Sequence, residues 1–372
     1  MKFILKIIIS ILNFIFYFMK LLPVQNKIVY ISRQSNQKSE DMALLEAAIY
    51  RLESTSLKQV FLCKKFDGNI IYKFCYGFHM LKQMYHLATA KIVVLDSYCI
   101  AVSVLNQRSS LVVIQMWHAL GALKKFGLSI VDKKEGRSGK LADVMKMHKN
   151  YTYILTSSQL CAPYFSQAFG YDETHIKVMS LPRVDKLKDE NIKKSISQKI
   201  YEAYPNMCGK KIVVYAPTFR KESDISEKIQ IIAQQFDNHE YAFVLKKHPL
   251  MKETCDACID EKNFSTLEMM MVADYIICDY SAVIFEASLL KKPIFFYVFD
   301  YEKYCDNRDF YIDYMKEMPG IISSNPYIIA ESIKNDDYDL ERVEAFGRKY
   351  VEHQQDCSQA LANMIVELSK QG

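Results

Sequence analysis

The chain has 372 residues, of which 50% are hydrophobic and 24% charged, so its composition excludes a disordered protein. A chain of this length is too long to fold around one ordinary hydrophobic core, so two domains are expected. The 48 basic and 43 acidic side chains leave a net charge of +5. This mild excess suits a phosphate-rich ligand or an anionic bilayer, but it is well short of the charge of a nucleic-acid binder.

The first 25 residues are strongly apolar and carry Lys2, Lys6 and Lys20. No small-residue cleavage site for a signal peptide precedes Lys20. The uncharged stretch Ile7–Met19 is shorter than the roughly 20 apolar residues that span a bilayer. We therefore expect residues 1–25 to form a helix lying in the cytoplasmic face of the cell membrane as a peripheral anchor. A buried core helix and an uncleaved single span are the alternatives.

After Pro23, short apolar runs alternate with amphipathic stretches, which is typical of an α/β chain. Helical spacing of apolar residues predicts helices over 41–52 and 76–90. Residues 26–190 are therefore expected to form a first, doubly wound Rossmann-like domain. Its predicted strands are 27–32, 59–63, 91–96, 111–117, 153–158 and 176–181.

A polar, lysine-rich stretch at 186–199 predicts an exposed helix or linker, after which a second alternating series begins. The chain returns to helix from near Asp339 to about Lys370. We expect a second Rossmann-like domain over 191–345, a C-terminal helix over 346–372, and a ligand cleft between the two domains. The predicted strands of the second domain are 211–219, 241–249, 274–279 and 293–300.

The ten cysteines are irregularly spaced, and only Cys255 and Cys258 form a close pair. No second pair lies at a zinc-like spacing, so no structural metal is expected. We interpret Cys255 and Cys258 as two half-buried thiols on a helix in a reduced, cytosolic compartment.

Polar residues at strand ends are the first candidates for a site, because ligands of open parallel sheets bind at the carboxyl ends of strands. The run LVVIQMW ends at Trp117, the only tryptophan, and is followed directly by His118. A histidine there can take a proton near neutral pH. Gly121 would let the backbone pass close to a ligand, and Lys124 and Lys125 could face phosphate. The alternative for His118 is a structural histidine at a capped strand end.

The second domain has three strand ends that carry polar side chains. Ser281 is expected to cap an apolar helix running to about Leu290, whose N-terminus would bind an anion. Each of these residues alone has an alternative interpretation as a cap or turn. The candidates are Thr218 and Arg220 after the first strand, Lys246 and His248 after the second, and Asp279, Tyr280 and Ser281 after the third.

Several common motifs are missing from the sequence. It contains no GxGxxG, no GxxxxGK[ST], no HExxH and no GxSxG. These absences argue against a dinucleotide fingerprint, a P-loop, a metalloprotease helix and a nucleophile elbow. A transferase site that holds phosphate with backbone amides and cations is the class that fits what remains.

Five segments occur in the order found in one family: 115–127, 215–220, 245–249, 278–300 and 307–314. They read QMWHALGALKKFG, YAPTFR, LKKHP, CDYSAVIFEASLLKKPIFFYVFD and NRDFYIDY. Over roughly residues 26 to 355 the chain resembles the CDP-glycerol glycerophosphotransferases of teichoic acid synthesis. The apolar N-terminus also fits the shorter, primase-like members of this family.

The resemblance implies a GT-B-like fold, no cofactor and no metal. It also implies transfer of glycerol phosphate from CDP-glycerol to a hydroxyl of an undecaprenyl-diphosphate-linked acceptor, with release of CMP. His118 matches the proposed base of the family and His248 its second essential histidine. Ser281 and its neighbours match the donor-phosphate turn, and Arg308 the arginine before FYxDY. Three positions depart from the family pattern: Cys278 where a hydroxyl residue commonly precedes the Asp of the turn, Ala282 where a second Ser follows Ser281, and Asp309 in place of a Gly.

Three alternatives are compatible with the same motifs. The donor could be CDP-ribitol, with primase and polymerase activity both open. A glycosyltransferase could use a nucleotide sugar on the same fold. A membrane-bound scaffold could have lost the site, although the joint presence of His118, His248 and Ser281 argues against it.

Overall fold

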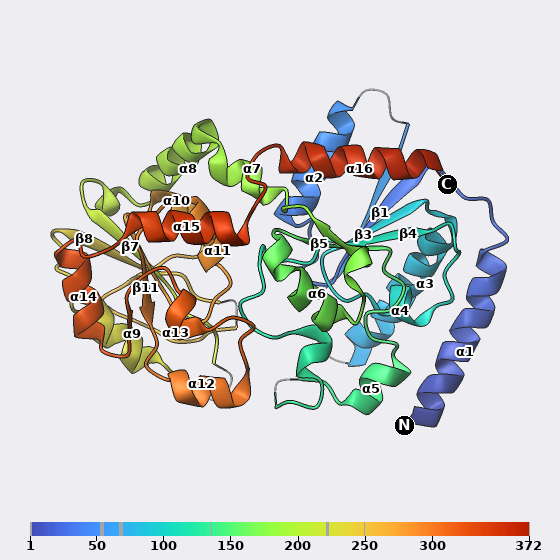
Figure 1. Cartoon of the computed structure of the whole chain (residues 1–372), viewed down its shortest axis with the longest axis horizontal. Helices are drawn as coiled ribbons and strands as arrows, with labels where there is room; N and C mark the ends of the chain where they lie inside the picture. The colour runs from blue at the N-terminus through green and yellow to red at the C-terminus, as the bar shows by residue number, and fades with distance from the viewer. Residues whose placement is uncertain are drawn as a thin grey trace. The chain divides into compact units, whose positions relative to one another are not determined.

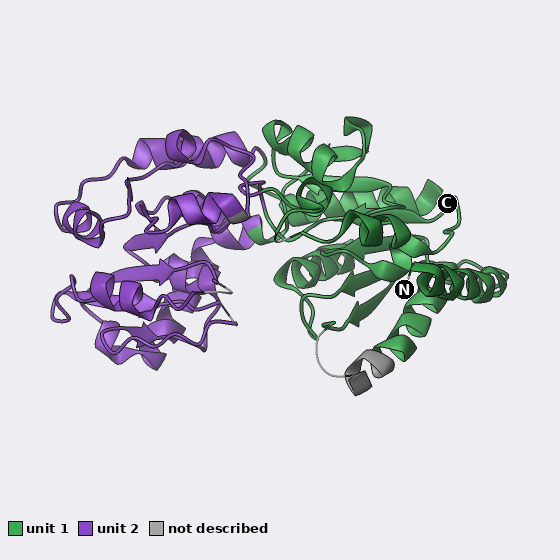
Figure 2. Ribbon diagram, turned by 90° about the horizontal axis from the view of Figure 1, so that it is seen from below, with its two compact units in different colours: residues 1–119, 125–183, 353–372 green, residues 120–124, 184–352 purple. Residues whose placement is uncertain are grey.

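A computed structural model describes residues 2–52, 56–66, 70–134, 136–220, 223–248 and 250–371. The chain forms two compact units (Figure 2). Unit 1 contains Met1–Ala119, Lys125–Arg183 and His353–Gly372, and unit 2 contains Leu120–Lys124 and Val184–Glu352. The chain passes from unit 1 to unit 2 at Arg183, whereas a boundary at 190 was expected, and its last segment returns to unit 1.

Unit 1 is built on a six-stranded sheet with the order β2-β1-β3-β4-β5-β6, in which all neighbours are parallel. Strand β1 is buried along its whole length. A parallel strand covered on both faces needs such a continuous apolar run. The strands are β1 (Lys27–Ser32), β2 (Lys58–Cys63), β3 (Ile92–Leu95), β4 (Val112–Gln115), β5 (Tyr153–Thr156) and β6 (Ile176–Val178).

Helices flank this sheet, with α16 packed against α2 and α1 packed against α3 (Figure 1). Ser39 caps α2 by accepting a hydrogen bond from the Met42 N–H. The helices are α1 (Lys2–Met19), α2 (Glu40–Arg51), α3 (Ile70–Thr89), α4 (Ile100–Val104), α5 (Gly139–Val144), α6 (Ala162–Phe169) and α16 (Cys357–Gln371).

Unit 2 contains a second six-stranded parallel sheet with the order β12-β11-β10-β7-β8-β9. Its strands are β7 (Lys211–Ala216), β8 (Tyr241–Leu245), β9 (Ile259–Asp260), β10 (Tyr275–Cys278), β11 (Ile294–Tyr297) and β12 (Ile322–Ser323). Its helices are α8 (Glu190–Ala203), α9 (Ser226–Ala233), α10 (Thr266–Val272), α11 (Ile284–Leu289), α12 (Tyr301–Asn307), α13 (Tyr314–Glu317), α14 (Pro326–Lys334) and α15 (Leu340–Tyr350). Helix α7 (Arg183–Lys188) leads into this unit.

All ten predicted strands are present, and several end earlier than expected. Strand β4 ends at Gln115 where 117 was expected, and β8 at Leu245 where 249 was expected. The residues beyond them form the loops at the carboxyl edge of each sheet. Strands β9 and β12 were not predicted, because two residues each cannot show a hydrophobic pattern.

The expected single C-terminal helix over 346–372 is wrong. Helix α15 ends at Tyr350 and α16 begins at Cys357. Asp356, just before α16, has a φ of 53°, so the backbone between the two helices is not helical. Helix α15 packs against α11 in unit 2, whereas α16 packs against α2 in unit 1.

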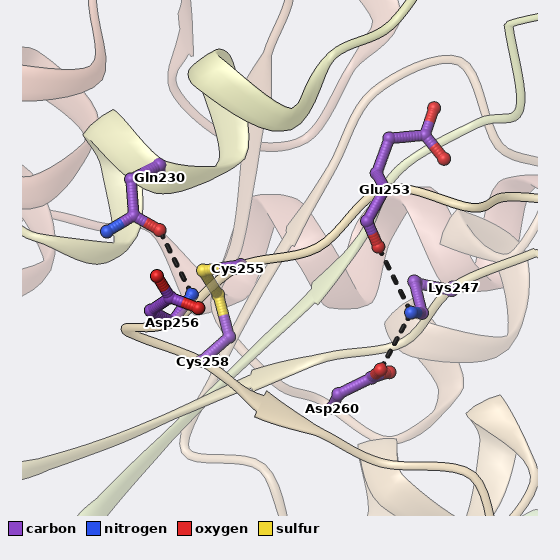
Figure 3. The surroundings of a disulfide bond; sticks show 7 residues. All are labelled: Gln230, Lys247, Glu253, Cys255, Asp256, Cys258 and Asp260. Carbon is purple, nitrogen blue, oxygen red and sulfur yellow. Dashed lines mark hydrogen bonds and ion pairs between the residues drawn. A yellow bond between two sulfur atoms is a disulfide. The ribbon is translucent and has the colours of Figure 1, made fainter.

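The interpretation of Cys255 and Cys258 as thiols on a helix is also wrong. They form a disulfide with a Cα–Cα distance of 5.4 Å, in the loop between β8 and β9 (Figure 3). A hydrogen bond of 3.2 Å from the Asp256 N–H to Gln230 Oε1 of α9 holds the turn between the two cysteines. Both cysteines pack against the apolar core of unit 2, so packing and the turn bring the sulfurs together.

Candidate functional site

The strand order of unit 1 reverses beside β1. The chain goes from β1 outward to β2 and then returns to β3 on the other side of β1. In open α/β sheets, ligands bind at the carboxyl ends of strands at such a switch point. Ser32 ends β1 there, and Asp96 follows β3.

His118 is an exposed side chain of the loop that follows β4, the neighbour of β3. Its Nδ1 lies 3.1 Å from the main-chain oxygen of Asp96 and 3.1 Å from Nε2 of Gln34. A main-chain oxygen only accepts, so the contact with Asp96 fits the tautomer with the proton on Nδ1; in that tautomer the Gln34 amide nitrogen, itself a donor, makes no hydrogen bond to Nδ1. In that tautomer, Nε2 carries the lone pair that a base needs.

Trp117 sets the direction of the chain just before His118. Its φ of 62° lies in the left-handed region, which residues other than glycine rarely adopt. The indole stacks on Phe126 at 5.1 Å and meets Phe169 edge to face at 5.3 Å. Strained backbone of this kind often occurs at functional sites, where the surrounding packing holds it in place.

Two carboxylates lie buried near this loop, and neither was predicted as a site residue. Asp41 of α2 accepts hydrogen bonds of 2.9 Å from both the main-chain N–H and Nε of Arg183. Arg183 also lies 3.4 Å from the main-chain oxygen of His118 through Nη2. Burial raises the pKa of the second carboxylate, Asp96, to about 6.

The loop after His118 contributes Leu120–Lys124 to unit 2. A side chain at Gly121 would come within 2.6 Å of the Phe285 ring of α11, so glycine is needed there for packing. Lys124 donates to the Tyr304 hydroxyl at 2.9 Å. Lys125 is half-buried and belongs to unit 1.

Unit 2 has its own switch point, between β7 and β10, and Asp279 lies there fully buried. Asp279 accepts hydrogen bonds from the Thr218 N–H at 2.9 Å and the Thr218 hydroxyl at 2.5 Å. It also accepts from the Tyr280 N–H at 2.6 Å and from Arg220 Nη1 at 2.5 Å. These bonds join the two strand ends.

The charged groups of Arg220 and Lys246, two of the strand-end candidates, bind carboxylates within unit 2. Besides Asp279, Arg220 binds Asp300 through Nε at 3.1 Å and Nη2 at 3.0 Å. Lys246 binds Glu261 Oε2 at 2.5 Å and the main-chain oxygen of Phe264 at 2.6 Å. A carboxylate that neutralises a buried cation also occupies the donors that a phosphate would use.

Tyr280 belongs to the same network. Its hydroxyl donates to Asp300 Oδ1 at 3.0 Å, and its ring stacks on Tyr304 at 3.9 Å. Asp300 therefore receives hydrogen bonds from both Tyr280 and Arg220. This arrangement fixes the turn that follows β10.

The prediction that Ser281 caps the following helix is wrong, whereas the predicted end of that helix near Leu290 is confirmed. Helix α11 begins at Ile284 with Val283 as its N-cap and ends at Leu289. The Ser281 hydroxyl accepts a hydrogen bond of 3.4 Å from the Val283 N–H, so Ser281 belongs to a turn before the helix. A six-residue helix offers little dipole for an anion.

His248 and Arg308 follow β8 and α12 in unit 2. The His248 ring is exposed and stacks on Phe219 with 5.5 Å between ring centroids. Its Nδ1 accepts from the Leu250 N–H at 3.2 Å. Arg308 is half-buried, and its main-chain N–H donates to the Tyr304 oxygen at 3.0 Å. Within the described ranges, no group of three or more His, Cys, Asp or Glu side chains could hold a metal ion.

Two doubly wound parallel sheets, each with polar residues at its switch point, define a GT-B-like α/β protein. The chain belongs to the CDP-glycerol:poly(glycerophosphate) glycerophosphotransferase family, whose model matches residues 14–367. It is 35% identical over 348 residues to the teichoic acid ribitol-phosphate primase of Bacillus spizizenii, covering 90% of this chain and 89% of that protein. It is 30% identical over 300 residues to the teichoic acid glycerol-phosphate primase of Bacillus subtilis, covering 78% and 77%.

Solved structures support the same fold. The wall teichoic acid polymerase TagF superposes with a TM-score of 0.75 at 20% identity, covering 98% of this chain and 95% of that one. The UDP-GlcNAc 2-epimerase from Neisseria meningitidis superposes with a TM-score of 0.55 at 11% identity, covering 92% and 100%. At these identities the likeness concerns the fold alone.

Proposed function

We propose that the chain transfers a polyol phosphate from a CDP-polyol to a hydroxyl of a lipid-linked acceptor and releases CMP. CDP-glycerol is the predicted donor, and an undecaprenyl-diphosphate-linked molecule is the predicted acceptor. Membership of the glycerophosphotransferase family supports the reaction class. The single structural observation that carries the proposal is His118, whose Nδ1 contacts the main-chain oxygen of Asp96 beside the switch point of unit 1.

In this proposal His118 is the general base of the transfer. Nε2 takes the proton of the acceptor hydroxyl, and the acceptor oxygen forms a bond to the phosphorus that carries the polyol. The bond from that phosphorus to the bridging oxygen breaks, and CMP leaves with the electron pair. A positioned base of this kind contributes roughly 10²–10⁴-fold to the rate.

Unit 2 is assigned the CDP-polyol. His248, Arg308 and the turn at Ser281 are proposed to hold the pyrophosphate and to stabilise the charge that moves to the leaving group. Arg220 and Lys246 act indirectly, because their donors are bound to Asp279, Asp300 and Glu261. Their proposed role is to fix the loops that carry the direct ligands.

CDP-ribitol is the second candidate donor. The similarity to the ribitol-phosphate primase is 35% over 90% of the chain, against 30% over 78% for the glycerol-phosphate primase. Release of CMP from each donor, measured with purified protein and a synthetic lipid-linked disaccharide, decides between them. Release from neither donor, with turnover of a UDP-sugar instead, would show that the chain is a glycosyltransferase.

The division of roles between the units has its own test. Ser281→Ala and Arg308→Ala should weaken the binding of CDP-glycerol or CDP-ribitol in calorimetric titration, and His118→Ala should leave it nearly intact. Equal losses of donor affinity in all three variants would contradict the assignment of the donor to unit 2.

Helix α1 is the proposed membrane anchor. It is long and apolar enough to cross a membrane by length and composition. Its packed face includes Phe16, which is 1% exposed, whereas Phe3 and Phe14 are 74% and 65% exposed. We assign it to the cytoplasmic leaflet, lying in the surface. Deleting residues 1–22 should release the protein from membranes, and full sedimentation of the deleted form with membranes would contradict this assignment.

A further inference from the structure

Asp96 has a buried carboxylate at the switch point of unit 1. Its side chain is 3% exposed; the hydroxyls of Ser32 and Ser97 lie near it, but neither Oδ1 nor Oδ2 makes a well-formed hydrogen bond among the residues that the structure describes. Buried carboxylates are ordinarily paired or hydrogen-bonded, because taking a charge out of water is costly. Folding alone gives no reason to keep such a group here.

Among the described residues, no cation contacts the Asp96 carboxylate. Asp41, equally buried, is neutralised by Arg183 at 2.5 Å. Arg33, from the loop after β1, directs Nη1 to the main-chain oxygen of Tyr98 at 3.1 Å. No ion pair to Asp96 is present within the described part of the chain, so an ionised Asp96 has no cation in contact with it.

The neighbouring strand β2 does not supply the missing charge. Burial raises the pKa of the Cys63 thiol to about 11, with Asp96 adding to the shift, so this group is neutral at physiological pH. His118 contacts Asp96 through the main chain, with Nδ1 3.1 Å from the main-chain oxygen of Asp96. A protonated imidazole there would bring a cation to this residue.

We propose that the Asp96 carboxylate is the counter-charge for the imidazolium that His118 forms when it takes the acceptor proton. Asp96 is then a positioning residue for the base: its main-chain oxygen orients the ring, and its carboxylate stabilises the charged form. The role in transfer rests on the proposed function, but the effect on the ionisation of His118 does not need the reaction.

The protonation state of Asp96 is compatible with this role. Burial raises its pKa to about 6, the hydroxyls of Ser32 and Ser97 oppose that shift, and Asp41 adds to it. The carboxylate is therefore mostly ionised above pH 7 and mostly neutral below pH 5. The counter-charge is available at neutral pH and is lost in acid.

The test is a direct titration of His118 by NMR in the full chain with labelled histidine, the His118 signals being assigned from His118→Gln. Asp96→Asn should lower the proton affinity of His118 about tenfold or more, since a unit charge at short range has an effect of that size. Asp96→Ser is a second variant that removes the charge with a smaller side chain. Asp143→Asn, which removes an exposed carboxylate of α5 in the same unit, should leave the titration unchanged.

The two proposals fail in different ways. An unchanged titration of His118 in folded Asp96→Asn and Asp96→Ser would overturn the counter-charge. A lower titration midpoint of His118 in these variants supports the counter-charge, even if the wild-type protein releases no CMP. Absence of CMP release would contradict the proposed function instead. Where CMP is released, the acidic limb of the rate profile should move to lower pH in Asp96→Asn, a change that a merely structural role would not produce.

Discussion

Arg220 and Asp279 form a buried ion pair in unit 2, with Nη1 2.5 Å from Oδ2. Arg220 lies in the loop that follows the end of β7 at Ala216, and Asp279 is the first residue beyond β10. The pair therefore ties together the two strands between which the sheet order reverses. A guanidinium at a strand end, which in the sequence resembles a phosphate ligand, serves here to fix the loops of the candidate donor site.

Arg220→Ala should lower the free energy of unfolding of unit 2. Any loss of activity should follow from that loss of stability. Removing one partner of a buried ion pair leaves an uncompensated charge, which costs about 3–5 kcal/mol of unfolding free energy. Denaturant titration followed by circular dichroism measures this loss. Arg348→Ala is the matched control, because its pair with Glu344 is exposed and is expected to contribute less than about 1 kcal/mol. Equal stability of the two variants would contradict the structural role of Arg220.

The strands and their carboxyl-end residues could be predicted because a buried parallel strand is a continuous apolar run. The partners of those residues could not. Asp41 and Arg183 are 142 positions apart and meet only through the tertiary fold. In the sequence, Asp41 is simply an acidic residue in the first turn of a helix, a common position for one.

The ion pair of Lys246 could not be predicted, for a similar reason. In the sequence LKKHP, a lysine that follows an apolar strand fits a ligand-binding residue as well as it fits a residue in an ion pair. Glu261, which binds it, follows β9, a strand too short to be recognised in the sequence. Lys246 could therefore be recognised in the sequence as a polar residue at a strand end. Its partner, Glu261, depends on long-range packing and could not.

The Cys255–Cys258 disulfide should contribute modestly to the stability of unit 2. It closes a loop with a sequence separation of 3. In the chain-entropy model so short a loop is worth about 2 kcal/mol. The Cys255→Ser/Cys258→Ser variant should lose that amount in denaturant titration without reductant, and Cys208→Ser, at an exposed free cysteine, should lose none. Thiol titration of the unfolded protein should find two more thiols after reduction; an unchanged thiol count would mean that the bond is absent.

Ionisation of the Asp96 carboxylate should lower the free energy of unfolding as the pH rises. Its pKa is raised in the folded state, from 3.8 to about 6, so the folded chain binds more protons than the unfolded chain between these values. The buried carboxylate therefore destabilises the folded state above pH 6, where it is ionised, and not below pH 4. A shift of about two pH units corresponds to about 3 kcal/mol.

The comparison of Asp96→Asn with wild type at two pH values isolates this effect. The difference in unfolding free energy should favour the variant more at pH 7.5 than at pH 4.5, by up to about 3 kcal/mol. Any cost of accommodating the amide is the same at both pH values and cancels. A difference that does not depend on pH would show that Asp96 is not a destabilising carboxylate.

His118→Ala should lower turnover by roughly 10²–10⁴-fold, the usual contribution of a positioned general base. His118→Gln, which keeps hydrogen bonding but cannot take a proton, should be nearly as inactive. Both variants should remain folded, because His118 is exposed and lies beyond the end of β4. The measurement is CMP release at saturating donor, with circular dichroism to check the fold.

The matched control for His118 is His175→Gln. His175 also places Nδ1 on a main-chain oxygen, that of Thr152 at 2.9 Å, but it precedes β6 and so lies at the opposite edge of the sheet. This variant should keep normal turnover. If His118→Gln also turned over normally, His118 would only position the acceptor, and the base would have to be sought at His248, the other exposed histidine that follows a strand end. A loss of activity confined to His118 variants, with donor binding intact, is what general-base catalysis requires.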